Sequence, residues 1–144
     1  MRFVRVAAVL SAICIDKIRA VAGESTCLSD GRCILGTSTL NLCNCDLEDN
    51  DMDGIAECIA DSQSAGTLQV LRICNNFLTY LASDVLQGLP QLERLHLNEN
   101  NLTEVPSLHF EHLFYLRLDN NYISSLESDA FQGTPKIEQL TTSP

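Results

Sequence analysis

Apolar residues recur along the second half of the chain in a short fixed pattern. Three eight-residue segments, 71–78, 95–102 and 116–123, carry apolar residues at their first, third and eighth positions and asparagine at the sixth. Each segment follows another leucine three residues earlier: Leu68, Leu92 and Leu113. Alternating apolar and polar residues is the period of a β-strand, so we expect three short strands that each turn their leucines to one face.

The same segments are part of a longer internal repeat. Residues 82–95 and 127–140 share seven of fourteen positions, and the units that begin at Leu68, Leu92 and Leu113 are 24, 21 and 24 residues long. A fourth unit begins at Ile137 and stops after a few residues. Repeats of this length indicate a solenoid in which each coil packs only against its neighbours.

Three asparagines fall at one point of successive coils. Asn76, Asn100 and Asn121 follow the expected strands at the same spacing. We expect each to hydrogen-bond backbone groups that the turn out of the strand would otherwise leave buried and unpaired.

The return segments differ between long and short repeats. Both 24-residue units contain Ser-Asp-x-x-Gln-Gly, so Asp84 or Asp129 is expected to cap one helical turn that Gly88 or Gly133 ends. In the 21-residue unit Pro106 favours an extended return segment.

These repeats resemble the extracellular leucine-rich repeat family over about half of the chain. The resemblance implies an α/β fold: a leucine-rich repeat solenoid with a short, curved parallel sheet on its concave face. The mixture of long and short units is similar to small leucine-rich proteoglycans, although Toll-type receptors also use such units. The resemblance implies binding of a protein partner rather than catalysis.

The first 22 residues have the features of a secretory signal peptide. Arg2 and Arg5 precede a short apolar run, and small residues at 20–22 suit cleavage. The alternative, a retained membrane anchor, would need about 20 apolar residues, and Asp16 and Lys17 interrupt the run. We therefore expect a secreted chain in which residues 1–22 are the signal peptide, 23–67 a cap, and 68–144 three complete repeats and the start of a fourth.

Removal of the signal peptide leaves an even number of cysteines. Cys14 is lost, and six remain, which in an exported chain indicates disulfides. Residues 27–58 resemble the cysteine-rich amino-terminal cap of extracellular leucine-rich proteins, so we expect a disulfide-rich N-terminal cap whose pairing the sequence leaves open. Zinc is the rival use of the thiols, but the chain has no C-x-x-C pair, and we expect no metal site. The six cysteines are Cys27, Cys33, Cys43, Cys45, Cys58 and Cys74.

The distribution of charged residues excludes some classes of partner and indicates one binding surface. The whole chain has a formal net charge of −10, and the signal peptide removes four basic residues but one acidic residue. We therefore expect no nucleic-acid partner and no insertion into membranes after signal removal. The few remaining basic residues gather on the expected strand face, and Arg and Tyr are enriched where proteins bind each other. We expect the partner-binding residues to be Arg72, Arg94, His96, Tyr115 and Arg117.

An alternative remains open for that cluster. Outward strand positions are commonly polar, and each arginine could pair with a nearby acid such as Glu93 or Asp119. In that case the cluster would be a solvated surface with no partner.

Other candidate chemistry is weaker. Residues 49–54 begin like a calcium-binding loop, but the twelfth position, which needs a carboxylate, is Ala60, and we favour a solvated acidic loop over 46–57. No histidine lies beside a nucleophile motif, so we expect no enzyme activity, no catalytic residue and no cofactor. Asn101 begins the one N-x-S/T sequon and is the expected glycosylation site.

The sequence therefore favours a secreted protein-binding module that presents its concave strand face to a matrix protein such as collagen, a growth factor or a receptor. One alternative is a structural extracellular-matrix component that self-associates through the uncapped C-terminal end. Another is a fragment of a larger leucine-rich repeat receptor.

Overall fold

The computed structural model describes residues 26–27, 33–34, 38–61, 65–82, 84 and 86–142. The expected signal peptide over residues 1–22 lies outside the described residues. Among the helices that are described, none is long and apolar enough to cross a membrane.

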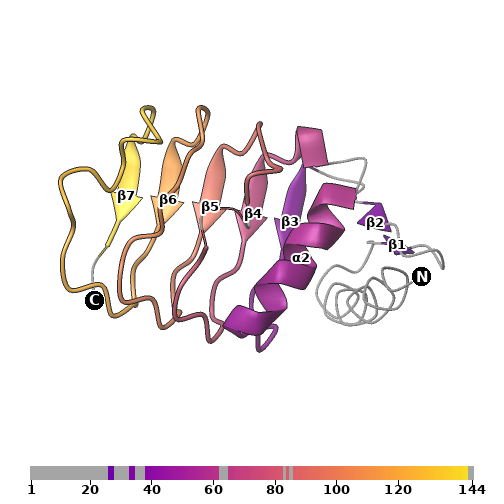
Figure 1. Ribbon diagram of the computed structural model, residues 1–144, viewed down its shortest axis with the longest axis horizontal. Helices are drawn as coiled ribbons and strands as arrows, with labels where there is room; N and C mark the ends of the chain where they lie inside the picture. The colour runs from indigo at the N-terminus through magenta and orange to yellow at the C-terminus, as the bar shows by residue number, and fades with distance from the viewer. Residues whose placement is uncertain are drawn as a thin grey trace.

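Five short parallel strands form one sheet in chain order. They are β3 (Thr39–Asn41), β4 (Val70–Arg72), β5 (Arg94–His96), β6 (Tyr115–Arg117) and β7 (Gln139–Thr141). Figure 1 shows them side by side from β3, next to helix α2, to β7 at the opposite end. The predicted parallel sheet is confirmed, and it gains β3 from within the segment that we assigned to the cap. A separate antiparallel pair, β1 (Thr26–Cys27) and β2 (Cys33–Ile34), precedes it.

The core consists mainly of the leucines that the alternation of apolar and polar residues predicts to face inward. The central strand residues Leu40, Leu71, Leu95 and Leu116 are in register, and each is at most 1% exposed. A second buried row lies two residues later, and a third is formed by Leu68, Leu92 and Leu113. Burying a leucine contributes about 1.5–3 kcal/mol, so these rows hold the coils together.

The asparagines form the predicted hydrogen-bond ladder. Asn100 Nδ2 donates to the carbonyl of Leu97 in its own coil (3.1 Å) and to that of Ile73 in the previous coil (2.9 Å). Its Oδ1 accepts from the amide of Leu78 at 3.2 Å. Asn76 and Asn121 make equivalent bonds, so each asparagine joins two successive coils.

The described parts of the return segments in the two long repeats consist of hydrogen-bonded turns. Around Asp84 and Asp129 the described backbone forms successive turns with i to i+3 hydrogen bonds, including Gln87 N to Asp84 O and Gln132 N to Asp129 O. These hydrogen-bonded turns are consistent with one helical turn at each site. Capping by the side chain of Asp84 or Asp129 stays a prediction.

The glycines of these two segments have different environments. A Cβ on Gly88 would meet no atom within 4 Å, but one on Gly133 would lie 2.1 Å from the carbonyl oxygen of Leu108. Gly133 therefore allows a close approach between two neighbouring coils. Its own carbonyl accepts from the amide of Phe110 at 2.9 Å.

The predicted acidic loop is instead helix α2 (Asp49–Asp61), so that prediction is wrong. Its apolar residues Met52, Ile55 and Ile59 share one face and are at most 4% exposed, within the core cluster. Asp51 Oδ2 accepts from the amide of Glu48 at 2.9 Å, a contact that satisfies a backbone donor at the helix start. The spacing of these apolar residues, rather than the density of aspartates, determines the structure of this segment.

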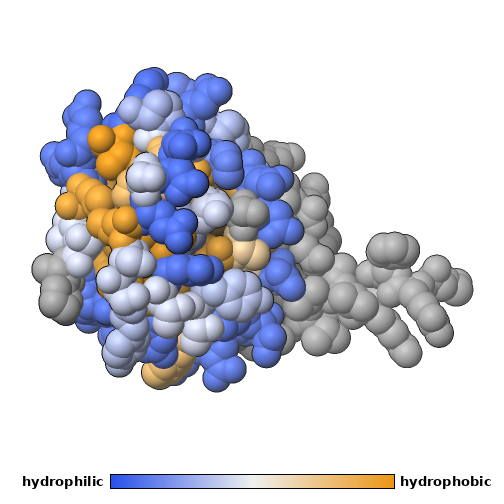
Figure 2. Space-filling view, turned by 60° about the vertical axis from the view of Figure 1, so that its left-hand side comes forward, coloured by the Kyte–Doolittle hydropathy of each residue, from blue (hydrophilic) through white to orange (hydrophobic). Residues whose placement is uncertain are grey.

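The end formed by β7 leaves apolar side chains exposed. From the sequence, an uncovered edge is expected near Leu116, Leu118, Phe131 and Leu140. β7 pairs with β6, so Leu116 and Leu118 are at most 1% exposed, but Leu140 is exposed as expected. Tyr122 and Leu126 are exposed as well. Figure 2, which turns this end forward, shows apolar side chains among hydrophilic ones.

Candidate functional site

The outward residues of β4, β5 and β6 form two columns, which together we call the strand face. Arg72, His96 and Arg117 occupy one column, and Val70, Arg94 and Tyr115 occupy the other. Adjacent strands lie about 4.8 Å apart, so these side chains are neighbours. The structure therefore places all five predicted partner-binding residues on this one face.

Arg117 is already paired within the chain. Its Nε and Nη2 donate to the two carboxylate oxygens of Asp119 at 3.0 and 2.8 Å. This hydrogen-bonded pair holds the pKa of Asp119 below its usual range and raises the pKa of Arg117. One of the pairings that we considered from the sequence is thus present, and it fixes the guanidinium in one orientation.

Arg94 stacks on aromatic rings. Its guanidinium carbon lies 5.2 Å from the ring centre of Phe114 and 5.8 Å from that of Tyr115. Glu93, the acid that we considered as its partner, instead accepts from Gln69 Nε2 at 3.2 Å. Within the described residues Arg94 makes no ion pair, and neither does the exposed Arg72. These two arginines therefore give the strand face two positive charges that no acidic side chain among the described residues neutralises.

His96 lies between the arginines. Its ring centre is 5.2 Å from that of Tyr115, with the planes tilted by 38°. Burial lowers the pKa of His96, the charges of Arg72, Arg117 and Arg94 lower it further, and Asp119 opposes them. The imidazole is therefore mainly neutral at pH 7, and it takes up a proton at a lower pH than an unperturbed histidine does.

The cysteines give one described cross-link. Cys43 and Cys74 form a disulfide, with 4.5 Å between their Cα atoms. They occupy equivalent places just after β3 and β4, so the bond ties the cap strand to the first repeat. The signal for this pairing is in the sequence, because residues 40–43 and 71–74 both read apolar-polar-apolar-Cys, but the pairing was not predicted. No disulfide of the other four predicted cysteines is described, so a disulfide-rich cap stays a prediction.

The other candidate sites are not part of this cluster. Asn101 lies in the turn after β5, its side chain half-buried and its amide bonded to the carbonyl of Leu78 at 2.8 Å. In α2, Asp49 accepts from the amide of Thr79 at 2.8 Å, which links the helix to the first repeat. Across the described part of the chain, no three His, Cys, Asp or Glu side chains are placed to hold a metal ion.

Comparison with known proteins gives one match. The family model described as leucine rich repeat matches residues 66–113, about a third of the chain. No curated protein and no solved structure matches the chain. The match supports a leucine-rich repeat family, and the five-strand parallel sheet fits a leucine-rich repeat solenoid.

Proposed function

We propose that this leucine-rich repeat solenoid is a secreted protein-binding module whose strand face docks an acidic group of an extracellular partner. Leucine-rich repeat domains generally mediate interactions between proteins. The observation that carries the proposal is the pair Arg72 and Arg94: two cations with no ion pair among the described residues, on a chain of net charge −10.

Each residue of the strand face has a separate role in this proposal. Arg72 and Arg94 bind carboxylates of the partner, and the aromatic stacking of Arg94 limits the entropy that its side chain loses on binding. Tyr115 contributes apolar contact area beside it. Arg117 keeps its two hydrogen bonds to Asp119, and its remaining guanidinium N–H groups donate to the partner. His96 adds attraction for an acidic partner only when it is protonated. We propose a binding function without enzyme activity.

The extracellular setting is supported by the signal-like segment over residues 1–22, the sequon at Asn101 and the disulfide between Cys43 and Cys74. The alternation of long and short units resembles small leucine-rich proteoglycan-type proteins. On that resemblance we propose a matrix protein, a growth factor or a receptor as the partner.

The test is capture of partners from extracellular fluid by the immobilised chain and by two charge-reversed variants. Arg72→Glu changes the strand face, whereas Lys136→Glu makes the same charge change at an exposed position away from it. Proteins retained by the original chain and by Lys136→Glu, but lost with Arg72→Glu, support the proposal. Equal retention by all three folded forms contradicts it.

A structural, self-associating matrix component is a second candidate. It is favoured by the exposed Tyr122, Leu126 and Leu140 at the β7 end. Sedimentation over a hundredfold concentration range tests it. A concentration-dependent increase in mass that Leu126→Glu abolishes supports self-association, and a constant monomer mass contradicts it.

A further inference from the structure

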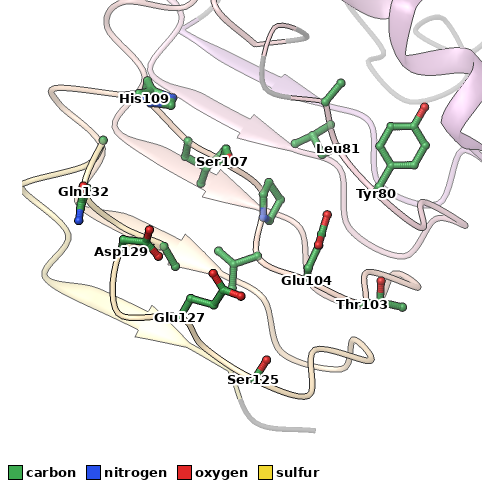
Figure 3. A pocket seen from close by; sticks show the side chains of 16 residues that line it. Tyr80, Leu81, Thr103, Glu104, Ser107, His109, Ser125, Glu127, Asp129 and Gln132 are labelled. Carbon is green, nitrogen blue, oxygen red and sulfur yellow. The ribbon is translucent and has the colours of Figure 1, made fainter.

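A groove of about 670 Å³ lies along the return segments of three successive coils. Its lining comes from residues 80–82, 103–109 and 125–133. Figure 3 shows Glu127 and Asp129 on one wall, with Glu104 and Tyr80 across from them. The groove therefore shares no residue with the strand face.

The groove arises from the unequal repeat lengths. The middle unit has 21 residues and the units on either side have 24, so its return segment takes a shorter path. Pro106 and Leu108 of this short segment are buried, and Ser107 between them is exposed. Residues from the two longer neighbours line the groove on either side of this short segment. The short repeat thus provides the floor, and the two long repeats provide the walls.

The chemistry of the lining is amphipathic. The lining is mostly polar, with Glu104, Glu127 and Asp129 supplying carboxylates, and Val105 with the largely buried Pro106 and Leu81 supplies a smaller apolar strip. Within the described residues none of these three carboxylates has a hydrogen bond or an ion pair, and no lysine or arginine lines the groove. Tyr80 lies in the same lining and is 54% exposed.

We propose that this groove binds a short basic segment of a partner protein, with a lysine or arginine side chain lying along the floor. Such a side chain has an apolar stem and a charged end, which matches an apolar strip beside carboxylates. The cation lies among Glu104, Glu127 and Asp129, and the ring of Tyr80 adds a cation-π surface. The negative charge of the whole chain attracts the same segment from a distance. The occupant is opposite in charge to the group that the strand face attracts, so this is a second and separate binding site.

The experiment is an NMR titration of the full chain, labelled with ¹⁵N, with the peptide Gly-Arg-Gly-Arg-Gly blocked at both ends. The same peptide with citrulline in place of arginine is the neutral control. We expect the arginine peptide to shift the amide signals of residues 103–109 and 125–133, and the citrulline peptide to shift them far less. Shifts centred on β4–β6, or equal shifts with both peptides, would overturn the proposal.

Two sets of variants separate a specific site from general charge attraction. The groove set is Glu104→Gln, Glu127→Gln and Asp129→Asn together, and the matched set is Asp84→Asn, Glu111→Gln and Glu138→Gln, which are exposed acids outside the groove. Both sets remove three charges. We expect at least tenfold weaker binding for the groove set and less than twofold for the matched set. Equal weakening by both sets overturns the proposal.

A third variant tests the groove without changing any charge. Ser107→Tyr places a bulky ring over the floor, and because Ser107 is exposed the fold tolerates it. We expect at least fivefold weaker binding of the arginine peptide. Unchanged affinity of the folded variant would show that the peptide does not use the groove.

Discussion

Replacing Asn100 with alanine tests the hydrogen-bond ladder that joins the coils. Asn100 is 4% exposed, and its side chain is the acceptor for the amide of Leu78 and a donor to the carbonyls of Ile73 and Leu97. Both carbonyls keep a second donor, from Asn76 at 3.1 Å and from Asn121 at 2.9 Å. The amide of Leu78 keeps none among the described residues.

The expected loss follows from this difference. A buried donor without a partner costs about 1–3 kcal/mol, and each of the two other lost bonds costs about 1 kcal/mol. We therefore expect Asn100→Ala to lower the free energy of unfolding by about 3–5 kcal/mol. Asn121 is half-buried, so water replaces part of what its removal loses, and Asn121→Ala should cost about half as much. Asn101→Ala, which changes the adjacent half-exposed residue, should cost less than about 0.5 kcal/mol.

The assay is urea unfolding of the three variants and the original chain at pH 7, in material made without glycosylation so that Asn101→Ala changes only the side chain. The midpoints and slopes give the free energies of unfolding. If Asn100→Ala lowers the free energy of unfolding no more than Asn101→Ala does, the asparagine hydrogen bonds do not hold the coils together.

Three further predictions use single residues. Glu99 has a left-handed backbone with φ of 57°, and the equivalent positions in other coils carry asparagine, which tolerates this conformation better. Glu99→Asn should therefore raise the free energy of unfolding by about 0.5–1 kcal/mol. A lower free energy of unfolding in urea would contradict this. Gly133→Ala brings a Cβ against the Leu108 carbonyl and should cost about 2 kcal/mol, whereas Gly88→Ala should cost nothing measurable in thermal unfolding. Because folding lowers the pKa of His96, the unfolded chain takes up the proton more readily as the pH falls below 6.5. The contribution of His96 to the free energy of unfolding is therefore complete above that pH and decreases below it. His96→Gln should flatten this part of the pH profile, and an unchanged slope would show that another group causes it.

The strand face was predictable because it depends on alternation and repeat length. Once the units are in phase, the residues after each inward leucine must share a column, as Arg72, His96 and Arg117 do. The sequence could not decide whether an arginine pairs with an acid within the chain. That depends on side-chain geometry at the strand end, where Asp119 lies within reach of Arg117 and Glu93 bonds elsewhere.

The cap was less predictable, although some of its signals are in the sequence. In the coil that begins with β3, Cys45 stands at the position of the ladder asparagine, so this unit did not align with the repeats. The helical spacing of Met52, Ile55 and Ile59 was outweighed by the acidic residues around it. The groove depends on how deeply three return segments lie relative to one another, which no local pattern encodes.

The central claim is that the partner covers the strand face, and covalent labelling of tyrosine and histidine side chains with mass spectrometry tests it most directly. The chain offers matched pairs: Tyr115 and His96 lie on the strand face, and Tyr122 and His112 lie away from it. With a captured partner bound, we predict reduced labelling of Tyr115 and His96 and unchanged labelling of Tyr122 and His112. Protection of Tyr122 and His112 with Tyr115 and His96 unchanged would contradict the account.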